Sequence, residues 1–489
     1  MREDGGRQRC STGVTGLDAV MQGGFVPKRS YLVRGGPGAG KTTLGLHFLA
    51  AGAAAGERSL FITLEESEER IREYALLRDI DLTDVAVLDI SPSSAFFVAS
   101  QSYDIFSPAE VEREPITASI VERIEALAPE RVFIDPMTQF RYLSDNAFQF
   151  RRQVVSFLRF MRERQATVLF TSERSASLAD DDLQFMSDGV IDITNSAAGR
   201  TLAVTKFRGS DFQAGAHTLK LVAAGVEVYP RMQPLARLGD RAFETVSSGV
   251  AGIDAILNGG IERGTVTLIT GPTGVGKTTL GMQFLQHAAG RGERSVAYTF
   301  DEDAAMVLHR CDGVGIAARA AVAAETLHIR KVEPLRYTAD EFDALVRVDV
   351  ERHGARMVMV DSVAGYTLAL RGEDLRPRLH ALAQYLQARD VALIIINEQE
   401  AIVGELRSTD MGLSHLADTL IFLRFLEMNG AMHKAIGVLK KRLSDYEKHL
   451  REFAITDRGI LVGEPLSGLR GILRGTPSFV GASHLETPS

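Results

Sequence analysis

The chain has 489 residues, a length that predicts two domains of roughly 240 residues each rather than one core. Its 55 lysine and arginine residues are outnumbered by 63 aspartate and glutamate residues, and the net charge of -8 argues against non-specific nucleic-acid binding. Its two cysteines indicate neither a disulfide framework nor a cysteine metal site. No run of about 18 apolar residues predicts a membrane span, so we expect a cytoplasmic protein.

An internal repeat begins near the N-terminus. Residues 11–18 read Ser-Thr-Gly-Val-Thr-Gly-Leu-Asp, and residues 247–254 read Ser-Ser-Gly-Val-Ala-Gly-Ile-Asp. The offset of 236 residues is kept through an apolar strand, a glycine-rich loop and an apolar helix. We therefore predict a first domain at 1–236, a second domain at 237–460 and a C-terminal tail at 461–489.

A phosphate loop of the form Gly-x-x-x-x-Gly-Lys-Thr follows the first strand of each unit, at residues 35–42 and 271–278. Such a loop turns backbone N–H groups toward phosphates, its lysine adds a positive charge, and its hydroxyl binds Mg²⁺. We therefore expect ATP and Mg²⁺ as ligands; the alternative is a glycine-rich turn that binds nothing. The predicted nucleotide-binding residues are Gly35, Gly36, Gly38, Ala39, Gly40, Lys41, Thr42, Thr43, Gly271, Thr273, Gly274, Val275, Gly276, Lys277, Thr278 and Thr279.

Short apolar runs alternate with longer amphipathic segments in both units. The runs include residues 60–62, 131–134 and 167–170 in the first unit, and 357–360 and 392–396 in the second. Continuous apolar strands favour a mostly parallel sheet that helices cover on both faces. The predicted fold class is therefore α/β, with two tandem P-loop nucleotide-binding domains whose ligands lie at the carboxyl ends of the strands.

Carboxylates follow several of these strands. Asp135 and Asp361 each end an apolar run, where an acidic residue beside the phosphate loop can hold the water shell of Mg²⁺. The alternative is an aspartate that caps the turn after a strand. The predicted metal ligands are Thr42, Asp135, Thr278 and Asp361.

An acidic pair begins 24 residues after each phosphate-loop lysine: Glu65 with Glu66, and Asp301 with Glu302. An ATPase needs a carboxylate here to orient and deprotonate the attacking nucleophile. A solvated acidic start of a helix is the alternative. Small polar groups at 171–173 and 397–398 end the next strand of each unit, where they either sense a γ-phosphate or form a plain turn.

A basic pair occurs late in each unit: Lys206 with Arg208, and Lys440 with Arg442. Period-2 spacing points both side chains of a pair to the same side of a strand. We interpret them as catalytic groups that reach the γ-phosphate of a neighbouring subunit. Two solvated bases on an edge strand are the alternative.

Together these motifs resemble the KaiC family, the double-lobed RecA-like ATPases of circadian clocks, over nearly the whole chain. The endings at 451–459 and 472–477 are also similar to that family's. The resemblance implies two tandem RecA-like domains in a double-ring homohexamer with ATP between subunits. It also implies a slow ATPase in the first lobe, and in the second a Ser/Thr autokinase that can remove its own phosphates.

The sequence departs from the family pattern at three places. Ser414 keeps the first phosphate-acceptor hydroxyl that the resemblance implies, but His415 stands where a threonine is expected. Asp301 is one methylene shorter than the expected glutamate, and Leu443 replaces a glycine after Arg442. The predicted phosphosite is therefore Ser414, and a two-site phosphorylation cycle is not expected.

Three functions compete on the sequence. The leading hypothesis is a KaiC-like ATPase and autokinase in signalling or timing, which associates with itself and with a clock or signalling partner. The second is a nucleotide-dependent assembly protein that transfers no phosphate, favoured by Asp301 and His415. The third is a RecA- or DnaB-like DNA motor, which the acidic net charge disfavours.

Overall fold

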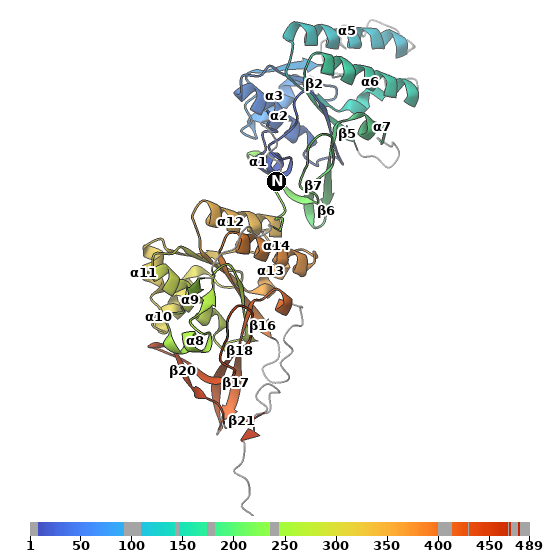
Figure 1. Ribbon diagram of the computed structural model, residues 1–489. Coiled ribbons are helices and arrows are strands. Elements are labelled where there is room, and N and C mark those ends of the chain that lie inside the picture. The colour runs from blue at the N-terminus through green and yellow to red at the C-terminus, as the bar shows by residue number, and fades with distance from the viewer. Residues whose placement is uncertain are drawn as a thin grey trace, which may run out of the picture. The chain divides into compact units, whose positions relative to one another are not determined.

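The computed structural model describes residues 8–91, 109–141, 146–173, 181–234, 244–399, 413–428, 430–467, 469–470 and 478–479. Contacts divide the chain into two compact units, Met1–Arg231 and Met232–Ser489 (Figure 1). The domain boundary expected at residue 236 falls within 235–243, outside the described residues. Within the described part of the chain, no helix is both long and apolar enough to cross a lipid bilayer.

The first unit contains a nine-stranded sheet in the order β3-β2-β4-β5-β1-β6-β7-β8-β9. The strands from β3 to β6 pair in parallel, and β6 to β9 pair antiparallel. Their bounds are β1 (Ser30–Gly35), β2 (Ser59–Thr63), β3 (Val85–Asp89), β4 (Arg131–Asp135), β5 (Thr167–Glu173), β6 (Gly189–Ser196), β7 (Gly199–Phe207), β8 (His217–Val222) and β9 (Gly225–Tyr229).

Helices cover both faces of this sheet because its strands are apolar on both faces. Along β1, Tyr31 and Val33 join one core cluster and Leu32 joins the other. The helices α1, α2 and α3 lie over the first cluster, and α5, α6 and α7 over the second (Figure 1). Their bounds are α1 (Thr15–Val20), α2 (Lys41–Ala54), α3 (Glu68–Leu76), α5 (Ala109–Leu127), α6 (Ala147–Glu163) and α7 (Asp181–Met186), with a 3₁₀ turn η1 (Met137–Arg141) after β4.

The second unit repeats this topology, with the strand order β14-β13-β15-β16-β12-β17-β18-β19-β20. Again the strands from β14 to β17 pair in parallel and the rest antiparallel. The bounds are β12 (Val266–Pro272), β13 (Ser295–Thr299), β14 (Leu327–Lys331), β15 (Met357–Asp361), β16 (Ala392–Gln399), β17 (Thr419–Met428), β18 (Ala431–Lys441), β19 (Arg451–Thr456) and β20 (Gly459–Pro465).

In the second unit α9, α10 and α11 pack on one face, and α12, α13 and α14 on the other (Figure 1). Two short ribbons, β10 (Thr245–Val246) with β11 (Ile261–Glu262) and β21 (Leu469–Arg470) with β22 (Ser478–Phe479), complete the described strands. The helices are α8 (Ala251–Ile256), α9 (Lys277–Gly290), α10 (Ala304–Gly313), α11 (Ala318–Ala323), α12 (Ala339–Glu351), α13 (Val363–Ala369) and α14 (Leu375–Ala388), with a 3₁₀ turn η2 (Leu413–His415).

The predicted fold class is confirmed: each unit is a mostly parallel sheet with helices on both faces, a RecA-like P-loop domain. Every apolar run cited from the sequence lies in a strand. The antiparallel strands at one edge of each sheet had not been predicted. The second sheet continues through β20 to Pro465, past the boundary expected at residue 460.

The repeated motif at 11–18 and 247–254 has a structural role, because its aspartate accepts hydrogen bonds from the first residues of the motif in both units. Asp18 accepts hydrogen bonds from the Thr12 backbone N–H at 2.7 Å, the Thr12 hydroxyl at 2.7 Å and the Ser11 hydroxyl at 2.6 Å. Gly13 has a φ of 78°, and a β-carbon there would lie 2.2 Å from the carbonyl oxygen of His47 in α2. The motif therefore fixes the N-terminal segment against the helix that begins at the phosphate loop.

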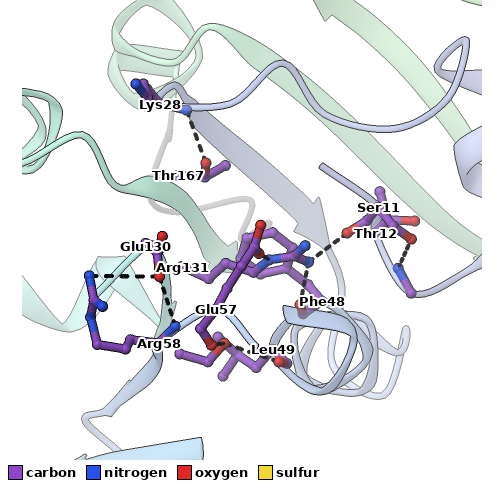
Figure 2. Close-up of polar contacts among 12 residues, drawn as sticks. Ser11, Thr12, Lys28, Phe48, Leu49, Glu57, Arg58, Glu130, Arg131 and Thr167 are labelled. Atoms are coloured by element: carbon purple, nitrogen blue, oxygen red, sulfur yellow. Dashed lines mark hydrogen bonds and ion pairs between the residues drawn. The ribbon is translucent and has the colours of Figure 1, made fainter. Parts of the chain in front are cut away.

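Arg131, the first residue of β4, anchors the end of that strand opposite Asp135. Its guanidinium pairs with Glu57 and donates to the carbonyls of Ser11 at 2.7 Å and Phe48 at 2.8 Å (Figure 2). The side chain is 3% exposed, so the pairing offsets the cost of burying a charge. The network holds β4, the N-terminal segment and α2 together and thereby fixes Asp135 relative to the phosphate loop.

Candidate nucleotide-binding sites

The first phosphate loop joins β1 to α2. Gly40 has a φ of 104°, which a residue with a side chain rarely adopts, and the helix begins at Lys41. The Lys41 ammonium is buried and donates to the carbonyl oxygens of Gly35 at 2.9 Å and Gly36 at 3.0 Å. Burial lowers the pKa of Lys41 because the charged form loses water. An anionic phosphate beside this ammonium would supply the charge partner that the two carbonyls do not.

The metal ligands predicted for the first unit lie together. The Thr42 hydroxyl donates to one carboxylate oxygen of Asp135 at 2.5 Å, and the Thr171 hydroxyl donates to the other. Burial raises the pKa of Asp135, opposed by these two hydrogen bonds. A divalent cation would favour the ionised carboxylate, and hydroxyl and carboxylate oxygens are donors that Mg²⁺ accepts. The donor set therefore fits Mg²⁺.

The second phosphate loop repeats these contacts at the start of α9. Lys277 is buried and donates to the Pro272 carbonyl at 2.9 Å, and burial lowers its pKa. The Thr278 hydroxyl donates to Asp361 at 2.7 Å. Burial raises the pKa of Asp361 to about 6. Both units therefore place lysine, hydroxyl and carboxylate in the same arrangement at the carboxyl ends of the strands.

These groups line a cavity of about 540 Å³ in the second unit. Its wall includes Lys277, Thr278, Asp361, and both members of the predicted catalytic pair. Arg310 of α10 and Lys434 of β18 also line it, and neither had been predicted. A cavity of this size, walled by two lysines, an arginine and four carboxylates, suits an anionic ligand that carries a metal ion.

The acidic pair of the first unit begins two residues after the end of β2. The Thr63 hydroxyl donates to the Glu66 carbonyl at 2.6 Å and fixes the backbone there, while both glutamate side chains are exposed. Gln139 of η1 donates to the Glu65 carboxylate. The Glu66 carboxylate has no hydrogen-bond or ion-pair partner among the described residues. It is therefore available to accept a proton.

The acidic pair of the second unit is held differently. The Thr299 hydroxyl again fixes the backbone, donating to the Glu302 carbonyl at 2.7 Å. The Glu302 carboxylate, however, accepts from both terminal nitrogens of Arg310, one of them at 2.8 Å. Among the described residues, the Asp301 carboxylate accepts one longer hydrogen bond, 3.3 Å, from the Ser362 hydroxyl. The structure thus brings both predicted carboxylates to the cavity, but one of them, Glu302, is held in an ion pair with Arg310.

In the first unit, the two members of the basic pair have different surroundings. The Lys206 ammonium donates to the carbonyl oxygens of Gln184 and Ser187, each at 2.6 Å, at the end of α7. Arg208 is exposed, and its guanidinium has no hydrogen-bond or ion-pair partner in the described part of the chain. The lysine therefore stabilises its own unit, and only the arginine is available to an outside ligand.

Lys440 and Arg442 follow the same division. The Lys440 ammonium donates to the carbonyl oxygens of Ser414 at 2.9 Å and Ala417 at 2.6 Å. The Arg442 side chain is about half exposed, and its contacts within the described part of the chain are 3.3 Å long, to the Asp418 carboxylate and to the His415 carbonyl. Lys440 thus holds the η2 turn that carries Ser414, which is half-buried.

Both arginines lie at the end of the sheet away from their own phosphate loop. The Arg208 N–H donates to the Asp188 carbonyl at 2.8 Å, and the Asp188 N–H donates to Ser30, the first residue of β1. In the second unit, Arg442 contacts Asp418 in the same way, and the Asp418 N–H donates to Val266 at the start of β12. A strand of six residues spans about 20 Å. Neither arginine can therefore reach the nucleotide loop of its own unit.

The weaker strand-end signals also lie at the sites. Thr171 contacts Asp135, as described, and Glu398 accepts a hydrogen bond from Thr273 of the second phosphate loop. Asn397 donates to Thr270 at 3.3 Å. These positions therefore border the predicted phosphate sites.

Sequence reasoning missed Gln139, Tyr74, Arg310 and Lys434. Gln139 and Arg310 each contact one member of an acidic pair, and the Tyr74 hydroxyl bonds to Thr43 of the phosphate loop at 2.8 Å. An alignment of the two units gives one signal, because Tyr74 and Arg310 are separated by the repeat offset of 236 residues. The other two carry no local pattern.

The fold and these paired sites define a tandem P-loop ATPase. A family model described as "ATPase: KaiC" matches residues 10–233 and 246–467. The chain therefore belongs to the KaiC family of ATPases.

Relatives in this family align over nearly the whole chain. A "Circadian clock oscillator protein KaiC" of Parasynechococcus marenigrum is 28% identical over 97% of this chain and 94% of its own length. A "Circadian clock protein KaiC3" of Synechocystis sp. is 25% identical over 99% and 97%. The "Circadian clock oscillator protein KaiC" of Synechococcus elongatus is 26% identical over 96% and 92%.

Proposed function

We propose that the two units divide the chemistry, with ATP hydrolysis in the first and phosphate transfer to a serine in the second. The Glu66 carboxylate has no partner among the described residues and follows β2, the strand beside the one that ends at Asp135, which supports its role as the general base for water. The Glu65 carboxylate, held by Gln139, completes the pair. Steady hydrolysis is therefore assigned to the first unit.

Each site would hold Mg²⁺ with the phosphate-loop hydroxyl and the strand-end aspartate, Thr42 with Asp135 and Thr278 with Asp361. Bound there, the ion would neutralise charge on the nucleotide phosphates. Lys41 and Lys277 would bind the phosphates directly. The short threonine–aspartate contacts in both units support this assignment.

The protein would act as a homohexameric ring in which each nucleotide lies between subunits. Arg208 and Arg442 support this assembly, because they are exposed at the sheet end opposite their own phosphate loops. A head-to-tail interface that closes into a ring would bring each arginine to a neighbour's nucleotide. The names of the relatives support a role in circadian-type timing or signalling, with a clock or signalling protein as partner.

The autokinase assignment depends on one observation: the position of Ser414. The η2 turn lies near the start of β12, next to Arg442, whereas Lys277 follows the other end of that strand. The serine therefore lies about 20 Å or more from its own nucleotide loop and on the side that would face a neighbour's. We propose that Ser414 accepts the γ-phosphate of the neighbouring subunit's ATP.

Labelled ATP tests this directly. Incubation of the full-length protein with labelled ATP and Mg²⁺ should label Ser414, and the label should be lost in Ser414→Ala and in Lys277→Ala. Thr419, in β17, is the matched control, because its side chain is buried and Thr419→Ala should keep the label. Label that survives Ser414→Ala would move the acceptor to another residue, such as Ser408 or Thr409, which lie outside the described residues.

A second function has support of its own. The Glu302 carboxylate is occupied by Arg310, which favours a second unit that binds ATP for assembly and transfers no phosphate. In that case no peptide of the protein would be labelled, while particles near six times 53.2 kDa would still form with ATP. The same labelling experiment therefore separates the two functions.

A further inference from the structure

Besides the shorter Asp301, the two catalytic pairs differ in the side chain that contacts the second carboxylate, because Glu302 pairs with Arg310. The helices that follow the pairs are equivalent: buried Ile71 and Ala75 in α3 correspond to buried Val307 and Cys311 in α10. At the corresponding half-buried position, the first unit has Tyr74 and the second has Arg310. The two side chains contact different groups.

Tyr74 contacts the phosphate loop rather than the first catalytic pair. Its hydroxyl bonds to Thr43, the residue after the metal-binding threonine, at 2.8 Å. Arg310 instead donates from both terminal nitrogens to both oxygens of Glu302, one contact being 2.8 Å. A planar guanidinium and a carboxylate in this two-point geometry form one of the stronger protein ion pairs.

This pairing has a chemical consequence. A carboxylate whose two oxygens both accept from a guanidinium has its charge compensated and its lone pairs engaged, so it is a poor acceptor for the proton of an attacking hydroxyl. Asp301 does not replace it freely, because it is shorter than glutamate and accepts from Ser362. The pair is only partly shielded, with side chains 35% and 33% exposed, so it can open without unfolding the helix.

We propose that Arg310 is a positioning residue that restrains Glu302, so that the second unit performs chemistry only while this ion pair is open. The inference rests on the proposed nucleotide chemistry of the second unit. Arg310 lines the same cavity as Lys277 and Thr278, so a bound phosphate can compete with Glu302 for the guanidinium. The restraint explains how two units with the same phosphate loop can have different turnover.

The test measures second-unit turnover in a background where Glu65→Gln and Glu66→Gln silence the first unit. In that background, Arg310→Gln should raise kcat roughly two- to tenfold, the range expected for opening a partly exposed ion pair, with a smaller change in KM. Arg310→Lys keeps the charge but loses the two-point geometry, so its kcat should lie between that of the background protein and that of Arg310→Gln. Adding Glu302→Gln should abolish the gain, because Arg310 acts through Glu302.

The reverse substitution supplies a matched control in the first unit. With Asp301→Asn and Glu302→Gln silencing the second unit, Tyr74→Arg should lower first-unit kcat, and the decrease should be absent when Glu66→Gln is also present. A gain that requires Glu302 in one unit and a loss that requires Glu66 in the other are not expected if the substitutions only impair folding.

Four results would overturn the proposal. A lower kcat in Arg310→Gln would make Arg310 a group that assists the reaction, and an equal gain with and without Glu302→Gln would show that it does not act through Glu302. If Arg310→Gln left kcat unchanged while the protein still bound a fluorescent ATP analogue, the proposed restraint would be wrong but the second unit would still be a nucleotide site. No binding of that analogue at the second unit would overturn the proposed function, and the restraint with it.

Discussion

At the scale of single residues, the lysine and the arginine of each late basic pair have different surroundings. Lys206 donates to two carbonyl oxygens at 2.6 Å in its own unit, whereas Arg208 is exposed. The period-2 spacing predicted that both members of a pair lie on one strand, but β7 ends at Phe207 and β18 ends at Lys441, so each arginine lies just past the end of its strand. The lysine therefore stabilises its own unit, and we propose that the arginine takes part in the reaction of a neighbouring subunit.

This division predicts different effects of Lys206→Ala and Arg208→Ala. Loss of the lysine removes charge-assisted hydrogen bonds at the end of α7 and should destabilise the protein by about 1–3 kcal/mol. Loss of the exposed arginine should change stability by less than about 0.5 kcal/mol but lower ATP turnover at least about tenfold. Urea unfolding and steady-state turnover of both variants measure the two effects.

A mixing experiment tests whether Arg208 acts on a neighbour. Subunits with Arg208→Ala and subunits with Glu65→Gln and Glu66→Gln should each be nearly inactive alone. Mixed rings would contain interfaces that combine an intact acidic pair with an intact arginine, so turnover should return. A mixture no more active than its parts would place the arginine outside the neighbour's site.

Much of the site followed from local sequence. The phosphate-loop lysines, threonines and strand-end aspartates were predicted because glycine spacing and strand ends determine where these groups lie, and the structure brings Thr42 to Asp135 and Thr278 to Asp361. Arg310 and Gln139 were missed because each contact depends on how a separate helical turn packs over a strand end. No short pattern encodes that packing.

At the scale of elements, the parallel part of each sheet was predictable because its strands are buried on both faces and therefore read as continuous apolar runs. The antiparallel strands β7 to β9 and β18 to β20 carry mixed polar and apolar residues, since they form the edge of each sheet. Their sequence does not distinguish them from loops. The helices after the phosphate loops, α2 and α9, share a glycine that packs against the sheet.

That shared glycine predicts unequal responses to one substitution. A β-carbon at Gly45 would lie 2.0 Å from the buried ring of Phe133, whereas one at Gly281 would lie 2.4 Å from the sulfur of Met359. The Phe133 ring is packed against Phe61, while a methionine side chain can rotate away. Gly45→Ala should cost about 1–3 kcal/mol, and at Gly281 a helix gain of up to about 1 kcal/mol should offset most of the strain.

Urea titration of the full chain, followed by hydrogen exchange of peptides from α2 and α9, compares the two variants in place. The expected result is a lower midpoint for the first unit in Gly45→Ala and a smaller shift for the second unit in Gly281→Ala. Equal shifts, or a larger one at Gly281, would show that the Phe133 ring yields as readily as the methionine.

At the scale of the whole molecule, the chain is one P-loop unit present twice, with the same strand order in both sheets and the same threonine–aspartate contact at both sites. The copies differ at the acidic pair, where Glu66 is open and Glu302 is held by Arg310. Family membership accounts for the shared part. From this difference we propose that steady hydrolysis takes place in the first unit.

Steady-state ATP turnover of two matched double variants tests that assignment most directly. Glu65→Gln with Glu66→Gln removes the acidic pair of the first unit, and Asp301→Asn with Glu302→Gln removes that of the second. Because a general base contributes about a hundredfold or more to the rate, the first variant should lose most of the turnover of the parent protein, and the second should keep most of it. Equal turnover in the first variant and the parent would contradict the account.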